Sequence, residues 1–400
     1  MSGDVSQKLE GGLNTIGAEL IELSHRIHSH PELAFKEHKA SQWTTEVLAS
    51  HGYSIQTKVA GMDTAFVAEA GSGDLHIAIC AEYDALPDVG HACGHNIIAA
   101  AAVGAGSILA PLADELGLTI SVFGTPAEEG GGGKILMLNA GLFEDIDVAM
   151  MVHPAPGELD RITAVAAQHI QIRYRGKEAH AAAFPSLGIN ALDAMTIAQV
   201  AIGLMRQSLL PDEMVHGIIT YGGDAPNIIP ALVEATYIAR ADTLERLKAL
   251  LPRLRACFEA GALATGATLE LTLPNPPYSE FITDESMAQL WVEEARRRGR
   301  NLLPPGSGNA LRASTDMANV SLSVPSIHPM LGIESLPAVN HQPEFTAACI
   351  KEPADRAVLD GSFLMAQVVA RIATDRELRL RYINGAQRSK LRAAVSLRSS

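Results

Sequence analysis

The sequence predicts an α/β protein in which a large domain with a mostly parallel sheet is interrupted by a smaller, inserted α+β domain. Short apolar runs rich in β-branched residues alternate with helical segments over residues 1–167, as in parallel sheets covered on both faces. From Gln168 the strands alternate polar and apolar residues, which is typical of a half-exposed antiparallel sheet. The length of 400 residues suits two domains.

The composition fits a large globular core and excludes several classes of protein. Hydrophobic residues make up 47% of the chain and charged residues 19%, a balance that disordered chains lack. The net charge of −14 disfavours nucleic acid as a partner, because an acidic surface repels phosphate groups. The cysteines are too few for a disulfide framework, and the first residues lack the apolar core of a signal peptide. We therefore expect a soluble cytoplasmic protein with no membrane partner.

Each element of the large domain follows from a local pattern. Apolar residues at helical spacing between Ile16 and Gly52, interrupted by Pro31, predict two helices. Further helices are expected from Asn96 and up to Gly141, and the alanines and glycines after Asn96 favour a buried helix over a membrane span. A strand is expected at 64–69, and stronger candidates for buried strands follow at 75–80, 118–123 and 148–152, where the chain is mostly apolar.

The inserted domain has the order β-α-β-β-α-β over about a hundred residues. Its expected strands begin at 168, 214, 231 and 268, and its helices span 190–208 and 244–265. The proline-rich run PNPPYSE ends it, and helices are expected again at 284–299 and 353–374. This pattern divides the chain into 1–167, 168–277 and 278–400, the last part with a basic tail from Arg376.

The run AEYDALPDVGHACGHN, residues 81–96, directly follows the expected strand that ends at Cys80. Open α/β sheets bind their ligands at this edge, where the carboxyl ends of the strands lie. His91, Cys93 and His95 alternate along the run, and thiolate with imidazole suits zinc or another transition metal. The same sequence could also hold a buried cysteine without a metal, flanked by surface histidines. This run alone therefore does not distinguish a metal site from ordinary structural residues.

The run GTPAEEGGGGK, residues 124–134, follows the next buried strand and therefore lies along the same edge. The neighbouring carboxylates of Glu128 and Glu129 repel each other unless a cation or a proton lies between them. In an extended loop they point in different directions, so that one can bind a metal while the other faces a water molecule. The run lacks the spacing of a phosphate-binding loop, whereas a helix N-terminus that favours acids remains an alternative.

Two more histidines extend the pattern. His153 ends the expected strand in MMVHP, and His341 lies in the polar loop VNHQPEF. Each by itself fits an ordinary structural or surface histidine. Cys93, His95, Glu129 and His153, however, follow three consecutive buried strands, and independent structural explanations would have to coincide at every one. The sequence therefore predicts a metal site at this edge.

The order of the motifs along the chain resembles that of the metallopeptidase family M20, which includes aminoacylases, carboxypeptidase G and the plant hydrolases of auxin conjugates. The motifs are HSHPELAFKE, AEYDALPDVGHACGHN, GTPAEEGGGGK, MMVHPAP, GKEAHAA, GGDAPNIIP, ASTDMANVS and NHQPEF. The AEYDALP…GHACGHN motif is most similar to that of p-aminobenzoyl-glutamate hydrolase and related dipeptidase-like amidohydrolases. The resemblance implies a catalytic domain with an inserted lid, through which members of the family dimerise.

The resemblance also implies a role for each matching residue. The expected metal ligands are Cys93, His95, Glu129, His153 and His341, and Glu128 is the expected general base. Asp84 and His91 are expected to lie behind the ligands and to orient them. In the lid, His180 is expected to reach into the partner's site, while Asn227 and Arg240 hold the carboxylate or the oxyanion of the substrate.

We interpret the chain as a metal-dependent amidohydrolase that cleaves small N-acyl amino acids or dipeptide-like amides with a free carboxylate, and that forms a homodimer through the lid. Two divalent ions are expected, zinc first, with manganese or cobalt as alternatives. One rival is a non-catalytic binding protein on the same fold, which the intact Glu128 argues against. The other rival is a redox protein using Cys93, which has no nearby resolving cysteine in the sequence.

Overall fold

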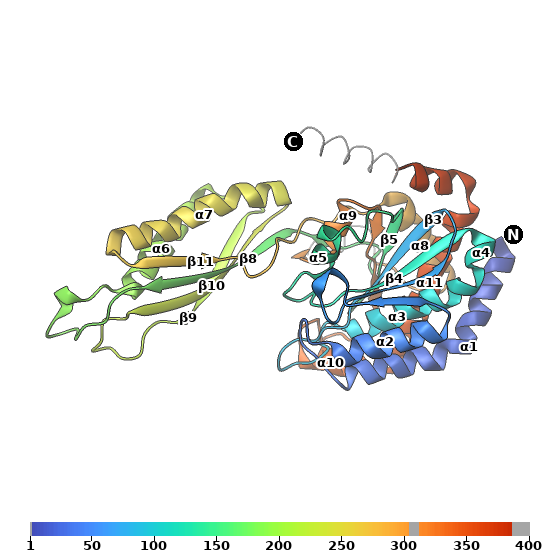
Figure 1. Ribbon diagram of the computed structural model, residues 1–400, viewed down its shortest axis with the longest axis horizontal. Coiled ribbons are helices and arrows are strands. Elements are labelled where there is room, and N and C mark those ends of the chain that lie inside the picture. Colours follow the sequence, from blue (N-terminus) through green and yellow to red (C-terminus); the bar gives the residue numbers. More distant parts are fainter. Residues whose placement is uncertain (1, 304–311, 386–400) are drawn as a thin grey trace. The chain divides into compact units, whose positions relative to one another are not determined.

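The computed structural model describes residues 2–303 and 312–385 (Figure 1). The last part of the predicted basic tail, residues 386–400, lies outside this description. The chain separates into two compact units. The first unit consists of the residues up to Thr163 and from Phe281 onward, and the second unit consists of Ala164–Glu280.

A mixed six-stranded sheet runs through the first unit, with β4, β3, β5 and β13 parallel to one another and β1 and β2 antiparallel at one side. The strand order is β1 (Ser54–Thr57), β2 (Phe66–Gly71), β4 (Leu118–Gly124), β3 (Leu75–Ala81), β5 (Val148–Met150) and β13 (Ser326–Ile327). Because β3, β4 and β5 are parallel neighbours, the segments that follow them leave the sheet at one edge. This arrangement confirms the predicted mostly parallel sheet.

Helices cover both faces of this sheet, because successive strand residues point in opposite directions. On β3, Ile77 and Ile79 join the large core with α1, α3, α8 and α11, while Ala78 and Cys80 face a smaller core with α5 and α9. The helices are α1 (Ser2–His28), α2 (His38–Ser50), α3 (His95–Leu109), α4 (Ala113–Leu116), α5 (Gly133–Asn139), α8 (Glu285–Arg297), α9 (Met317–Ser321), α10 (Pro343–Ala348) and α11 (Glu352–Thr374).

Two of these helical segments are long and apolar enough to cross a membrane, His95–Leu116 and Glu352–Thr374. In the structure, 89% of the first apolar window and 78% of the second are buried inside the protein. They pack in the core of the first unit, which is the environment that their alanines and glycines predict. A cytoplasmic location stays a prediction.

The second unit follows the predicted β-α-β-β-α-β order (Figure 1). Its antiparallel sheet has the order β11 (Thr268–Thr272), β8 (Ala166–Arg175), β10 (Leu232–Ala241) and β9 (Met214–Tyr221). The helices α6 (Ala191–Met205) and α7 (Leu244–Thr265) cover one face, and the strand residues buried against them, such as Ile170 and Tyr237, alternate with more exposed ones. The unit therefore has a core of its own.

The structure differs from the sequence-based prediction in several short elements, such as β13, β14 (Met330–Gly332), α9 and α10, and at three positions that matter here. α1 begins at Ser2 rather than near Ile16, because the buried Val5, Leu9 and Leu13 continue the helical spacing. The strand β1 was not predicted, since SIQT is a short, mostly exposed edge strand without an apolar signal. His153 does not end β5 but begins β6 (His153–Ala155), which pairs with β14. Two more short strands are β7 (Thr163–Ala164) and β12 (Arg312–Ala313).

Candidate active site

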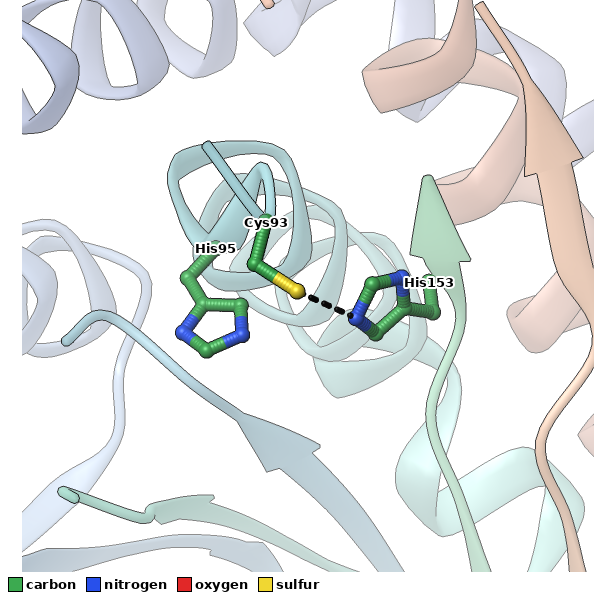
Figure 2. Close-up of side chains that lie close together, drawn as sticks. All are labelled: Cys93, His95 and His153. Carbon is green, nitrogen blue, oxygen red and sulfur yellow. Dashed lines mark hydrogen bonds between the residues drawn. The ribbon is translucent and has the colours of Figure 1, made fainter. Parts of the chain in front are cut away.

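Cys93, His95 and His153 converge at the carboxyl edge of the first unit's sheet (Figure 2). Cys93 lies in the loop after β3, His95 begins α3, and His153 begins β6. Their ligand atoms all lie within 4.8 Å of one another, and the thiol Sγ of Cys93 is 3.4 Å from Nε2 of His153. A soft sulfur and two imidazoles in this arrangement suit zinc or a similar metal.

Cys93 also belongs to a second group, with Glu129 and His341. Its Sγ is 3.7 Å from Nε2 of His341, and that nitrogen is 3.5 Å from Oε1 of Glu129. The loop that carries His341 is tied to the loop of Cys93, since the His341 N–H donates to the carbonyl oxygen of Ala92. The structure thus brings all five predicted ligands together around one sulfur atom.

A third group consists of His95, Glu128 and Glu82, and Glu82 was not among the predicted site residues. Nε2 of His95 lies 3.5 Å from Oε2 of Glu82 and 3.9 Å from Oε2 of Glu128. Glu128 and Glu129 therefore join different groups, although residues 128–131 form a turn and not the extended loop that was expected. The signal that could have revealed Glu82 is its position directly after a strand that is buried along nearly its whole length.

Asp84 holds two members of these groups in place. Its Oδ1 accepts the hydrogen bond of His95 Nδ1 at 3.0 Å, and its Oδ2 accepts the Glu129 N–H at 3.0 Å. The proton on Nδ1 leaves the lone pair of His95 Nε2 directed towards Glu82 and Glu128. His91 is buried and stacks on His28, and among the described residues it is not part of any ligand group.

A buried ion cluster lies behind the third group. The Nζ of Lys134 donates to Glu82 Oε1 at 2.5 Å and to Asp316 Oδ1 at 2.7 Å, and all three side chains are fully buried. The backbone N–H of Lys134 donates to Asp316 Oδ2. Lys134 and Asp316 lie in the motifs GTPAEEGGGGK and ASTDMANVS, and no role was predicted for either residue.

The buried acidic groups at the carboxyl edge of the sheet would be stabilised by a nearby positive charge. Burial raises the pKa of Glu128 well above its usual range, and the nearby Glu82 and Glu129 raise it further. Buried polar atoms with no hydrogen-bond partner include Oε2 of Glu82, Nε2 of His95 and Oε1 of Glu129. Unpartnered acceptors cost free energy in a core unless something binds them. The donor set of sulfur, imidazole and carboxylate therefore fits divalent metal ions.

The candidate residues of the second unit lie at two separate ends of its sheet. His180 is exposed, and its Nδ1 accepts the N–H groups of Ala182 and Ala183 at 3.2 and 3.1 Å. Asn227 lies beside it, since its carbonyl oxygen accepts the Ala181 N–H. Arg240 stands near the other end of β10, opposite Ala167. β10 spans about 27 Å from Leu232 to Arg240, so Arg240 cannot meet the other two residues on one small molecule in the same chain.

The fold and the ligand cluster define a metal-dependent hydrolase of the α/β class. Residues 78–356 match Peptidase family M20/M25/M40, and the chain belongs to this family. It is 38% identical over 359 residues to Xaa-Arg dipeptidase of Mus musculus, covering 86% of this chain and 82% of the relative. It is 32% identical over 270 residues to one of the subunits of p-aminobenzoyl-glutamate hydrolase of Escherichia coli, covering 62% and 56% of the two chains.

Solved structures show the same fold. An aminobenzoyl-glutamate utilization protein from Klebsiella pneumoniae superposes with a TM-score of 0.72 at 18% identity, over 92% of this chain and 99% of that chain. The YXEP protein of Bacillus subtilis, a dinuclear metal binding peptidase from the M20 family, gives 0.64 at 22% identity, over 90% and 99%. The chain is therefore an enzyme, an amidohydrolase that acts on the C–N bond of small amides, and not a non-catalytic binding protein.

Proposed function

We propose that the edge binds two divalent metal ions that share Cys93 as a ligand. The membership of Cys93 in two ligand groups is the observation that carries this proposal. One ion would be held by Cys93, His95 and His153, and the other by Cys93, Glu129 and His341. Three protein ligands leave an open position for chemistry at each ion. Thiolate and imidazole favour zinc, with manganese and cobalt as alternatives.

Divalent ions held by these ligands supply Lewis acidity, which polarises the amide carbonyl and allows water to be deprotonated near neutral pH. Glu128 is the general base, which takes a proton from the attacking water and delivers it to the leaving nitrogen. Its membership in a group different from that of Glu129 supports this assignment. Asp84 orients His95 and the backbone of Glu129 through its two hydrogen bonds.

The substrate that we propose is a dipeptide or N-acyl amino acid whose free carboxylate binds Arg240. A guanidinium matches a carboxylate with two parallel hydrogen bonds. Dipeptides with a basic C-terminal residue are the first class to test. The matches to enzymes named Xaa-Arg dipeptidase support this choice, and the net charge of −14 favours the approach of a cationic side chain.

We further propose a homodimer in which His180 and Asn227 of one chain complete the site of the other. Because Nδ1 of His180 accepts two backbone N–H groups, the neutral ring carries its proton on Nε2. An exposed Nε2–H donor suits the oxyanion that develops during amide hydrolysis. The distance along β10 between the two ends of the sheet supports a contribution from a second chain.

Metal analysis of the purified protein tests the centre. We expect close to two metal ions per chain, and loss of activity against a panel of dipeptides, N-acyl amino acids and p-aminobenzoyl-glutamate after chelation. Cys93→Ser should lose bound metal, because the shared ligand is gone. Cys257→Ser is the matched control, since Cys257 lies half-buried on α7 in the second unit. One metal ion per fully active chain would contradict the dinuclear proposal.

A further inference from the structure

The motif HSHPELAFKE contains a buried acid that has no part in the ligand groups. Glu37 is fully buried and occupies the N-cap position of α2, yet its side chain does not cap that helix. Glu32 caps it instead, because one of its carboxylate oxygens accepts the N–H groups of Lys39 and Ala40. The carboxylate of Glu37 is therefore used elsewhere.

Glu37 accepts three hydrogen bonds from three different segments. Its Oε1 accepts the N–H groups of Phe35 and Ala127, both at 2.9 Å, and its Oε2 accepts the hydroxyl of Thr64 at 2.8 Å. The carbonyl oxygen of Thr64 accepts the Tyr83 hydroxyl at 2.5 Å, which connects this network to the segment after β3. The loop after β4 is thus bonded to Glu37 directly, and the segment after β3 is connected to Glu37 through Thr64.

The bond to Ala127 is made at a strained position directly before Glu128. Ala127 has a φ of 59°, in the left-handed region that residues other than glycine seldom adopt. One residue after Glu128, the N–H of Glu129 is held by Asp84. Buried carboxylates therefore hold the backbone on both sides of Glu128. A strained backbone persists only where its surroundings over-determine it, and such positions cluster at active sites.

The turn before Glu37 also packs on this loop. The ring of Phe35 lies so close to Gly131 that a Cβ on the glycine would come within 2.4 Å of it. Phe35 itself has a φ of 62°, and its N–H is bonded to the same Glu37 oxygen as the N–H of Ala127. One oxygen atom thus joins the turn to the loop of Glu128.

We propose that Glu37 is a positioning residue for hydrolysis, which fixes the backbone at Ala127 so that the Glu128 carboxylate faces the reacting water. This inference rests on the proposed role of Glu128 as the base. Among the described residues Glu37 is not part of any ligand group, and we expect it to act through the peptide of Ala127. Misplacing a catalytic group by about 1 Å can cost about a hundredfold in rate.

Three substitutions at Glu37 test whether its role depends on the length of the side chain or on its negative charge. Glu37→Ala leaves two backbone N–H groups without their acceptor, and we expect kcat to fall by about 10–100-fold with KM and metal content nearly unchanged. Glu37→Gln keeps the length and the acceptor oxygen, so it should retain most of kcat. Burial raises the pKa of Glu37 to about 7, so we expect the loss of its charge to cost little. Glu37→Asp keeps the charge but is one methylene too short, and it should behave like Glu37→Ala.

Glu32→Ala is the matched control, because it removes an acid from the same motif and uncaps α2 without touching the Ala127 bond. It should lower the unfolding midpoint but not kcat. Unchanged kcat in Glu37→Ala would overturn the proposal. Equal kcat values for Glu37→Gln and Glu37→Asp would also overturn it. The comparison of these two variants tests the proposal even if Glu37→Ala does not fold. Glu128→Gln is measured alongside: if it is active, the assigned base is wrong, whereas an inactive Glu128→Gln with an active Glu37→Ala refutes only the role of Glu37.

Discussion

The two units hold their candidate functional residues in opposite ways. In the first unit most of them are buried, among them Cys93, His95 and Glu128, whereas His341 is exposed. His95 is fixed by a hydrogen bond from its ring to Asp84. In the second unit His180 and Asn227 are exposed and lie on loops beyond the ends of the strands. In the enzyme that we propose, the reactive centre is assembled within one unit, and His180 and Asn227 would act only when they meet the surface of a second chain.

The largest expected effect tests the buried side of this comparison. Glu128→Gln should lower kcat by about 10²–10⁴-fold, because proton transfer fails, while the bound metal is retained. Glu129→Gln should instead lower the metal content, since Glu129 belongs to the ligand group of Cys93 and His341. Stopped assays on samples of known metal content measure both effects. Loss of metal in the first variant and full activity in the second would reverse the two assignments.

We also expect the buried ion pairs of Lys134 to contribute more to the free energy of unfolding than ion pairs at the surface. Lys134→Ala leaves the carboxylates of Glu82 and Asp316 buried without their cation and should cost about 3–5 kcal/mol of unfolding free energy. Urea titration of metal-free protein measures this, and both tryptophans, Trp43 and Trp291, report on the first unit.

Lys8→Ala is the matched control for Lys134→Ala. Lys8 also pairs with two carboxylates of the first unit, those of Asp4 and Glu115, but it does so at the surface. Exposed pairs contribute little because water and salt screen them. The Lys8 variant should therefore keep the wild-type midpoint, and equal shifts in the two variants would contradict the importance of burial.

The exposed side of the comparison is tested by mixing subunits. His180→Ala alone should lose about 10²–10³-fold in kcat, the usual cost of an oxyanion donor. Mixing it with Glu128→Gln should restore about a quarter of the wild-type activity, because half the dimers are hybrids and each has one complete site. Subunit exchange is verified by mass spectrometry of differently tagged chains. Exchange without recovery would show that each chain uses its own His180.

The smallest expected effect concerns substrate recognition in the second unit. Arg240→Ala should lower kcat/KM for a carboxylate substrate by about 1.5–3 kcal/mol, the range for a hydrogen bond to a charged group. The loss should nearly vanish for the matching carboxamide, which offers no charge to the guanidinium. Equal losses for the two substrates would remove Arg240 from carboxylate binding.

The sequence by itself determined the longer helices and strands and the edge at which the ligand groups gather. Period-two and helical spacings depend on local backbone geometry, so the strands β3 and β4 and the helix α7 were predictable within a residue or two. The carboxyl ends of parallel strands must share an edge, which brought Cys93, His95, Glu129 and His153 together before any coordinates.

Only the tertiary structure decided which charged residues lie inside and with which partners. Glu82 and Lys134 are 52 residues apart in the sequence, and Glu37 and Ala127 are 90 apart. In the sequence, a glutamate on the surface cannot be distinguished from a glutamate that anchors a strained loop, because no periodic pattern of apolar residues marks either one. Their roles depend on desolvation and on donors from distant segments, which exist only after the chain has folded.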